Sequence, residues 1–172
     1  MIVECCSQEK TFISFYGLLG ERFCRLNKVW ESAFSDGFEE TYKTIHRFET
    51  SRLRNIAKFY GHLLAADAID WNIFSLVSLT EQDTTSSSRI FLKILLQDLV
   101  SSLGLKKLIE RFNDDKAIIS VQTQAGLVNR NAFEGMFPKD HPKNTRFAIN
   151  YYTSIGLGAV TGILFYLTVK KI

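Results

Sequence analysis

The chain has 172 residues, of which 46% are hydrophobic and 23% are charged. These proportions are typical of a globular domain and exclude a disordered chain, which is poor in hydrophobic residues. The net charge of +3 is too small to indicate a dedicated duplex-DNA-binding protein, because such proteins carry dense clusters of Lys and Arg. With only 2 Pro and 10 Gly, the chain lacks the turn residues of a β-sandwich, so we expect long helices.

The chain contains three cysteines, Cys5, Cys6 and Cys24, and two of them are adjacent. An odd number of cysteines with this spacing is not typical of a disulfide framework, so the sequence indicates a reducing compartment. The three histidines lie at no zinc-ligand spacing relative to the cysteines. We therefore expect no metal site, and cysteines that act as small apolar residues. The opening residues lead directly to Glu9 and Lys10, which leaves no apolar stretch for a secretory signal.

Apolar residues recur at intervals of three and four in several segments, and this spacing predicts amphipathic helices. The helices predicted in the first half are Thr11–Leu26, Val29–Phe48 and Ser51–Ala66. The third has the clearest pattern, with one apolar face and an opposite face that we expect to be wet and basic. A short apolar run, Ala68–Leu76, follows a turn at Asp67 and suggests a helical hairpin.

The second half begins with a helix predicted over Asp83–Leu103. The run Thr84–Ser88 supplies capping side chains at its start, and Gly104 is expected to end it. A shorter helix is predicted over Leu105–Phe112. The next stretch, Lys116–Asn131, is equally compatible with strand, helix or loop, so its structure is left open.

These elements predict an all-α fold of seven or eight helices in antiparallel pairs, a HEAT-like stack. Pro138 and Pro142 bracket a loop before the last long segment, which begins at Arg146. No low-complexity linker divides the chain. We therefore expect a single helical domain over residues 1–172, as part of a larger protein.

No catalytic motif is present, because the sequence contains no G-x-S-x-G, H-E-x-x-H or Walker-type glycine loop. Gly156, Gly158 and Gly162 superficially imitate a dinucleotide fingerprint. A dinucleotide site also requires an acidic residue about twenty positions further on, within a βαβ unit, and the printed sequence ends at Ile172. The sequence therefore predicts a protein that is not an enzyme and uses no cofactor.

Three basic residues, Arg52, Arg54 and Lys58, follow one another along the predicted helix Ser51–Ala66. A basic helical surface is typical of contacts with RNA phosphates, so these residues are RNA-binding candidates in a direct RNA-binding module. The alternative interpretation is that they provide solubility and pair with acidic neighbours such as Glu49. The sequence leaves both interpretations open.

The end of the chain contains a long uncharged segment, Phe147–Val169, flanked by Arg146 and by Lys170 and Lys171. It exceeds the roughly 20 residues that cross a bilayer, so a tail-anchored membrane protein is one alternative. Clustered polar residues and three glycines make it less apolar than a typical span, which favours a core helix or a protein interface. Whether the apolar tail Ala159–Ile172 is core, interface or membrane segment is left open.

Five short segments are specific enough to compare with a single protein family. They are Cys5–Lys10, Phe15–Cys24, Leu53–Asn55, Thr84–Phe91 and Asn144–Asn150. In this order they resemble the MA-three domain of the nucampholin family of spliceosomal proteins, also called the complexed-with-Cef1p protein twenty-two family. The resemblance extends from Cys5 to about Gly158, so it covers nearly the whole chain.

This resemblance implies a nuclear, non-catalytic scaffold for pre-mRNA splicing with a HEAT-like fold. In the family, a preceding MIF-four-G domain, which this chain does not contain, grips a DEAD-box helicase. The MA-three domain docks the parent protein onto the spliceosome core near the U5 proteins. The expected partners are therefore spliceosomal proteins, with indirect contact to RNA and no contact with a membrane.

The matched motifs supply candidate partner-binding residues, to which we add one residue of the apolar tail. These candidates are Thr85, Ser86, Arg89, Asn144, Arg146 and Phe165. The hydroxyls near Thr85 are expected to cap the helix that carries Arg89, and Arg146 is expected to pair with a carboxylate or a helix C-terminus. MA-three domains of translation scaffolds bind a related helicase through acidic surface residues, so the resemblance makes Glu81 and Asp83 further candidates.

Overall fold

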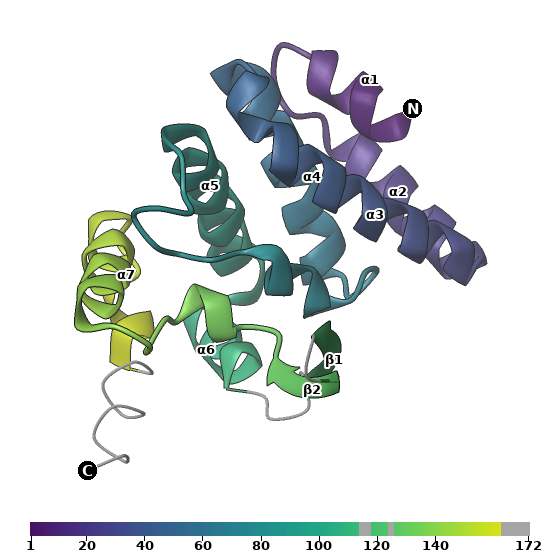
Figure 1. Cartoon of the computed structure of the whole chain (residues 1–172). Helices are drawn as coiled ribbons and strands as arrows, with labels where there is room; N and C mark the ends of the chain where they lie inside the picture. The colour runs from purple at the N-terminus through teal and green to yellow at the C-terminus, as the bar shows by residue number, and fades with distance from the viewer. Residues whose placement is uncertain (114–117, 124–125, 163–172) are drawn as a thin grey trace. The chain divides into compact units, whose positions relative to one another are not determined.

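The computed structural model describes residues 1–113, 118–123 and 126–162 of the chain. Its elements, with short 3-10 helices marked η, are in chain order α1 (Ile2–Gln8), α2 (Ser14–Leu26), α3 (Lys28–Thr44), η1 (Ile45–Arg47), α4 (Thr50–Ala65), η2 (Trp71–Leu76), α5 (Ser86–Leu103), α6 (Leu105–Phe112), β1 (Ile118–Thr123), β2 (Gly126–Asn131), η3 (Glu134–Met136), α7 (Pro142–Ser154) and η4 (Gly158–Val160) (Figure 1). The helical, HEAT-like class predicted from the sequence is confirmed.

The chain divides into two compact units, each built from two stretches that are separated in sequence. The first unit comprises Met1–Trp71 and Thr85–Leu105. The second comprises Asn72–Thr84 and Lys106–Ile172. The single domain expected over residues 1–172 stays a prediction, and the two units are described separately.

Helix α4 is the centre of the first unit, where it packs against α1, α2 and α5. Its apolar residues Leu53, Ile56 and Leu63 are buried, as the sequence pattern predicts. Asn55, Ala57 and Gly61, which lie further round the helix, are buried as well. The expected wet, basic face is therefore found only in part: three neighbouring helices contact α4, and of its basic residues Arg54 is exposed whereas Arg52 and Lys58 are partly buried.

An aromatic cluster joins three helices of the first unit. The ring of Phe38 from α3 lies 5.1 Å from that of Tyr60 from α4 and 5.9 Å from that of Phe91 from α5, measured between centroids. All three side chains are fully buried. The Tyr60 hydroxyl donates a hydrogen bond to the backbone oxygen of Phe34 at 3.1 Å, so its burial leaves no unsatisfied donor.

Helix α5 begins and ends through the residues that the sequence indicates. Thr85 is its N-cap and forms a capping box with Ser88, in which each side chain bonds the other residue's backbone N–H. At the other end, Gly104 adopts a φ of +83°, which only glycine takes readily, and the helix stops at Leu103. The predicted cap and the predicted end are both confirmed.

Replacing Thr85 by alanine is expected to lower the free energy of unfolding by about 1 kcal/mol, because the backbone N–H of Ser88 loses its acceptor. The measurement is the midpoint of urea unfolding, followed by circular dichroism. Ser86→Ala is the matched control, since this neighbouring hydroxyl is exposed. Equal losses in the two variants would contradict the capping role.

The second unit has its own aromatic core. The ring centroid of Phe112 lies 5.1 Å from that of Phe133 and 5.3 Å from that of Phe137. Phe137 in turn stacks on Tyr152 of α7 at 5.4 Å, and the Tyr152 hydroxyl donates to the backbone oxygen of Met136 at 3.2 Å. These contacts fix α6, η3 and α7 around one apolar centre.

The stretch Lys116–Asn131, which the sequence left open, contains the antiparallel strands β1 and β2. They pair in a register that runs from Ile118 opposite Asn131 to Thr123 opposite Gly126. A two-stranded hairpin is therefore added to the predicted helical fold.

The segment Phe147–Val169 does not begin as one continuous helix. Helix α7 ends at Ser154, Gly156 follows with a φ of +82°, and the short η4 comes next. Within the part of the chain that the structure describes, no helix has both the length and the apolar character needed to cross a membrane. Residues 163–172, which include Phe165 and most of the apolar tail, lie outside the described residues.

Candidate interaction surfaces

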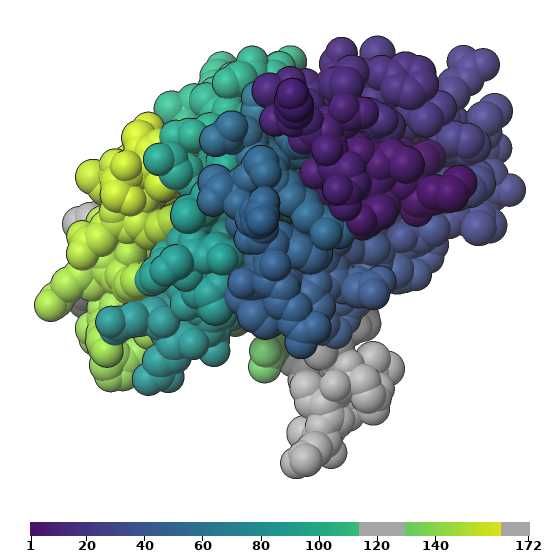
Figure 2. Space-filling model, turned by 90° about the horizontal axis from the view of Figure 1, so that it is seen from above, coloured from purple at the N-terminus to yellow at the C-terminus, as the bar shows by residue number. Residues whose placement is uncertain are grey.

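The first unit exposes large apolar side chains on two consecutive helices. Phe15, Leu18 and Leu26 of α2, with Val29 and Trp30 at the start of α3, are between 40% and 68% exposed. These five residues define what we call the α2–α3 face. In the space-filling view, the purple N-terminal elements that include these helices form part of the outer surface (Figure 2). Several large apolar side chains exposed on neighbouring helices are typical of a protein interface.

The small residues of α2 explain why its large apolar residues point outward. Gly17 and Gly20 are buried, and α2 packs against α4. A Cβ atom added at Gly17 would lie 2.7 Å from Cγ of His62, and one added at Gly20 would lie 2.9 Å from Cζ of Phe59. Such close packing needs glycine on the inner side, so Phe15 and its neighbours remain outside.

A hydrogen bond on the inner side of α2 fixes this orientation of the helix. Glu21 lies 2.9 Å from Nε2 of His62 on α4, and it also pairs with Arg25 one turn further along α2 at 2.6 Å. The hydrogen bond with His62, followed by that with Arg25, lowers the pKa of Glu21 below its ordinary value, although burial acts in the opposite direction. Glu21 therefore holds the inner side of α2 on α4.

The stability of the first unit is expected to depend on the ionisation of Glu21. Because its folded-state pKa is lowered, the ionised carboxylate stabilises the fold above its unfolded pKa, and this contribution is lost as the pH falls through the folded pKa. Glu21→Gln should therefore be less stable than the unchanged chain near pH 6. The difference should shrink between about pH 5 and pH 3.

Thermal unfolding of the two proteins across this pH range is the measurement. Glu39→Gln, which removes a surface pair with Lys43 on α3, is the matched control. A stability difference for Glu21→Gln that stays constant down to pH 3 would contradict the role of the pair.

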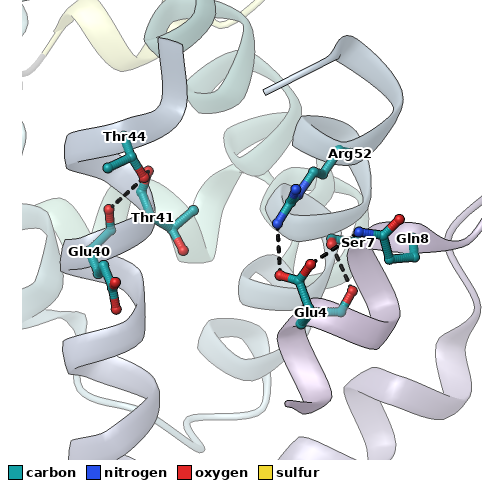
Figure 3. Close-up of polar contacts among 7 residues, drawn as sticks. All are labelled: Glu4, Ser7, Gln8, Glu40, Thr41, Thr44 and Arg52. Carbon is teal, nitrogen blue, oxygen red and sulfur yellow. Dashed lines mark hydrogen bonds and ion pairs between the residues drawn. The ribbon is translucent and has the colours of Figure 1, made fainter. Parts of the chain in front are cut away.

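The three RNA-binding candidates on α4 lie in different environments. Nη2 of Arg52 is 2.7 Å from Oε2 of Glu4 on α1, and its guanidinium carbon lies 4.4 Å from the ring centroid of Phe48. Figure 3 shows this pair, together with Ser7 and Gln8 bonded to Glu4. Arg52 thus ties α1 to α4.

The other two candidates are less involved in helix contacts. Arg54 is exposed, whereas Lys58 is partly buried and lies near Asp98 of α5. Burial raises the pKa of Asp98, and the charge of Lys58 opposes this rise in part. Only one of the three is therefore fully available at the surface. Contact of these residues with RNA stays a prediction.

The candidate partner-binding residues fall into both units. In the first unit, Thr85 and Ser86 are exposed at the start of α5, and Arg89 is half-buried one turn later. In the second unit, Asn144 donates to Asp140 at 3.1 Å. The remaining described candidate, Arg146 on α7, is exposed. No single surface is established for these residues, and their roles stay predictions.

The two acidic candidates both belong to the second unit and are both engaged there. Glu81 pairs with Lys143 of α7 at 2.8 Å. Asp83 accepts hydrogen bonds from the hydroxyls of Ser78 and Thr80 at 2.7 and 2.8 Å, which lower its pKa. Asp83 therefore organises its own loop. Among the residues described, no group of three or more potential ligands is placed to hold a metal ion.

Comparison with known proteins identifies the class of this fold. Residues 1–70 match the MA3 domain family. This is the helical module that the sequence motifs indicate.

The particular relatives are pre-mRNA-splicing factors of the Cwc22 type. The chain is 54% identical over 161 residues to pre-mRNA-splicing factor cwc22 of Emericella nidulans, which covers 94% of this chain and 17% of that protein. It is 51% identical to pre-mRNA-splicing factor cwf22 of Schizosaccharomyces pombe, and this match also covers 94% of this chain and 17% of that protein. The CWC22 homolog of Drosophila melanogaster is 48% identical, over 94% of this chain and 11% of that protein. The resemblance to this family is thus confirmed, and the chain spans about one sixth or less of these relatives.

Proposed function

We propose that this chain is a non-catalytic scaffold module that docks its parent protein onto the spliceosome in the nucleus. The proposal rests on the 54% identity over 94% of the chain to a protein named a pre-mRNA-splicing factor. The MA3 match and the helical architecture support a module that holds partners rather than one that makes or breaks bonds. The expected partners are spliceosomal proteins of the U5-associated core, and a DEAD-box helicase binds through a different domain of the parent.

The observation on the molecule that best supports docking is the α2–α3 face. Its five large apolar side chains remain exposed on two consecutive helices, whereas α5 of the same unit exposes only Ile90 to this extent. Exposed apolar residues reduce solubility without stabilising the fold, so their presence together is better explained by a partner that covers them.

The experiment compares the tagged full-length parent with a version that lacks residues 1–172 of this chain. Both are precipitated from nuclear extract, and the recovered U5 and U6 small nuclear RNAs are quantified. We expect recovery with the parent and its loss with the deletion. A parent carrying Lys43→Glu, an exposed change on α3 away from the apolar residues, is the control. Equal recovery from all three would contradict the proposed function.

A further inference from the structure

We propose that the α2–α3 face binds one amphipathic helix of a partner protein, and that this helix carries carboxylates opposite Arg22 and Lys28. The inference rests on the proposed docking function and specifies its surface and the chemistry of its partner. It is independent of the candidate residues on α5 and α7.

The spacing of the exposed residues on α2 fits a helical partner. Phe15, Leu18, Arg22 and Leu26 are three, four and four residues apart, so they form one stripe along the helix. The stripe from Phe15 to Leu26 is about 16 Å long at 1.5 Å per residue. Three turns of a second helix cover that length and present apolar residues at the same intervals.

Trp30 provides a pre-ordered anchor at one end of the stripe. Its ring centroid lies 4.7 Å from that of Phe23, so one side of the indole is packed. The residue nevertheless remains 40% exposed. A tryptophan that is already held in place loses little freedom when a partner covers its other side, and such residues dominate binding energy at interfaces.

The charged residues beside the stripe indicate which charge the partner helix carries. Arg22 and Lys28 are exposed, and neither forms an ion pair within the described part of the chain. The nearest carboxylate on α2, Glu21, is already engaged by His62 and Arg25 on the inner side. Glu31, in the first turn of α3, is the other carboxylate close to this face, and it is half-buried. The exposed charges beside the stripe, Arg22 and Lys28, are cationic, and acidic residues on the partner complement them.

The same charges disfavour a second copy of this chain as the occupant. In a symmetric dimer the face would meet its own copy, which brings Arg22 and Lys28 close to equivalent cations. In a bilayer, Arg22 would enter the interface in the middle of the apolar stripe, between Leu18 and Leu26. Anionic lipid headgroups would pair with this guanidinium as well, so the vesicle experiment described below decides between a bilayer and a protein helix.

The first test locates the occupant by photo-cross-linking. Benzoylphenylalanine replaces Leu18 in one full-length parent and Leu26 in another, and Lys93 on α5, which is also exposed, carries it in the control. After irradiation in nuclear extract, we expect both face positions to cross-link to one segment of another protein. That segment should have apolar residues at helical spacing and Asp or Glu beside them.

Three results of this test would overturn the inference. They are cross-links to another region of the parent itself, cross-links to a second copy of the parent, and yields at Leu18 and Leu26 no higher than at Lys93. Sedimentation of the parent with vesicles of phosphatidylcholine and phosphatidylserine in a 3:1 ratio adds a fourth. Vesicle binding that is lost on Leu18→Asp would assign the face to a membrane.

The second test measures the chemistry of binding, with a synthetic peptide of the cross-linked segment and the full-length parent. Leu18→Asp is expected to weaken binding at least tenfold, since it places a charge in the apolar stripe. Arg22→Gln is expected to weaken it several-fold, and less at high salt. In a peptide whose carboxylates are replaced by amides, Arg22→Gln should have no further effect. An unchanged effect of Arg22→Gln on the amide peptide would refute the charge pairing.

The outcomes separate this inference from the proposed function. In one outcome, deletion of residues 1–172 abolishes recovery of the small nuclear RNAs, whereas Leu18→Asp combined with Leu26→Asp does not. This result would support the proposed docking function and contradict the α2–α3 face as its binding surface. If the deletion itself has no effect, the function is wrong. Thermal unfolding checks that the double variant still folds, and Ser102→Asp at an exposed position of α5 is the control for added charge.

Discussion

Replacing Phe38 by alanine is expected to lower the free energy of unfolding by about 3–5 kcal/mol, as is typical when a buried aromatic side chain is truncated. Phe38 is fully buried, and its ring lies within 6.0 Å of those of Tyr42, Tyr60 and Phe91. The change therefore removes apolar contacts with two other helices at once and leaves a cavity between α3, α4 and α5.

Urea unfolding of the purified chain, followed by circular dichroism, measures this loss. Phe15→Ala is the matched control, because the same truncation occurs at a residue that is 60% exposed. Its expected effect is within about 0.5 kcal/mol. A loss below about 1 kcal/mol for Phe38→Ala would show that the aromatic cluster does not organise the first unit.

Gly135→Ala is expected to destabilise the second unit by about 2–3 kcal/mol, through overpacking. A Cβ atom at this position would lie 2.1 Å from the backbone oxygen of Val77. This oxygen belongs to the main chain and has no rotamer into which it can move. The backbone oxygen of Gly135 also accepts a hydrogen bond from the N–H of Leu79 at 2.8 Å, so any shift that relieves the clash strains this bond.

The expected result is a lower unfolding temperature of the purified chain, measured by differential scanning calorimetry. Gly158→Ala is the matched control, because the nearest atom to its added methyl group is Oγ1 of Thr153 at 3.8 Å, an ordinary contact. An unchanged unfolding temperature in Gly135→Ala would mean that the segment from Val77 to Leu79 does not pack on η3 as described.

Helix positions were predictable because their causes are local. The apolar spacing within Ser51–Ala66 and the capping hydroxyls before Arg89 act over a few residues, and the structure has α4 at Thr50–Ala65 and α5 after the Thr85 cap. Boundaries differed where a helix changed type. The predicted helix Val29–Phe48 ends as α3 at Thr44 and continues as the short η1.

The candidate site was less predictable, because exposure depends on neighbours that are distant in sequence. The periodicity of α2 is equally compatible with its large residues facing inward or outward. The signal that decides between them is the pair Gly17 and Gly20, which permits close contact with His62 and Phe59 on α4. The spacing of these glycines is visible in the sequence, but their partner is not.

The sequence by itself determined the helical class, the resemblance to the Cwc22 family, the cap of α5 and its end at Gly104. These properties follow from local spacing and from motifs read in order. Only the tertiary structure decided that α4 is enclosed on most sides, that Arg52 joins α1 through Glu4, and that Phe15 and Leu18 stay exposed. The physical reason is that burial is a property of pairs of surfaces, and a single helical pattern does not specify which surface it meets.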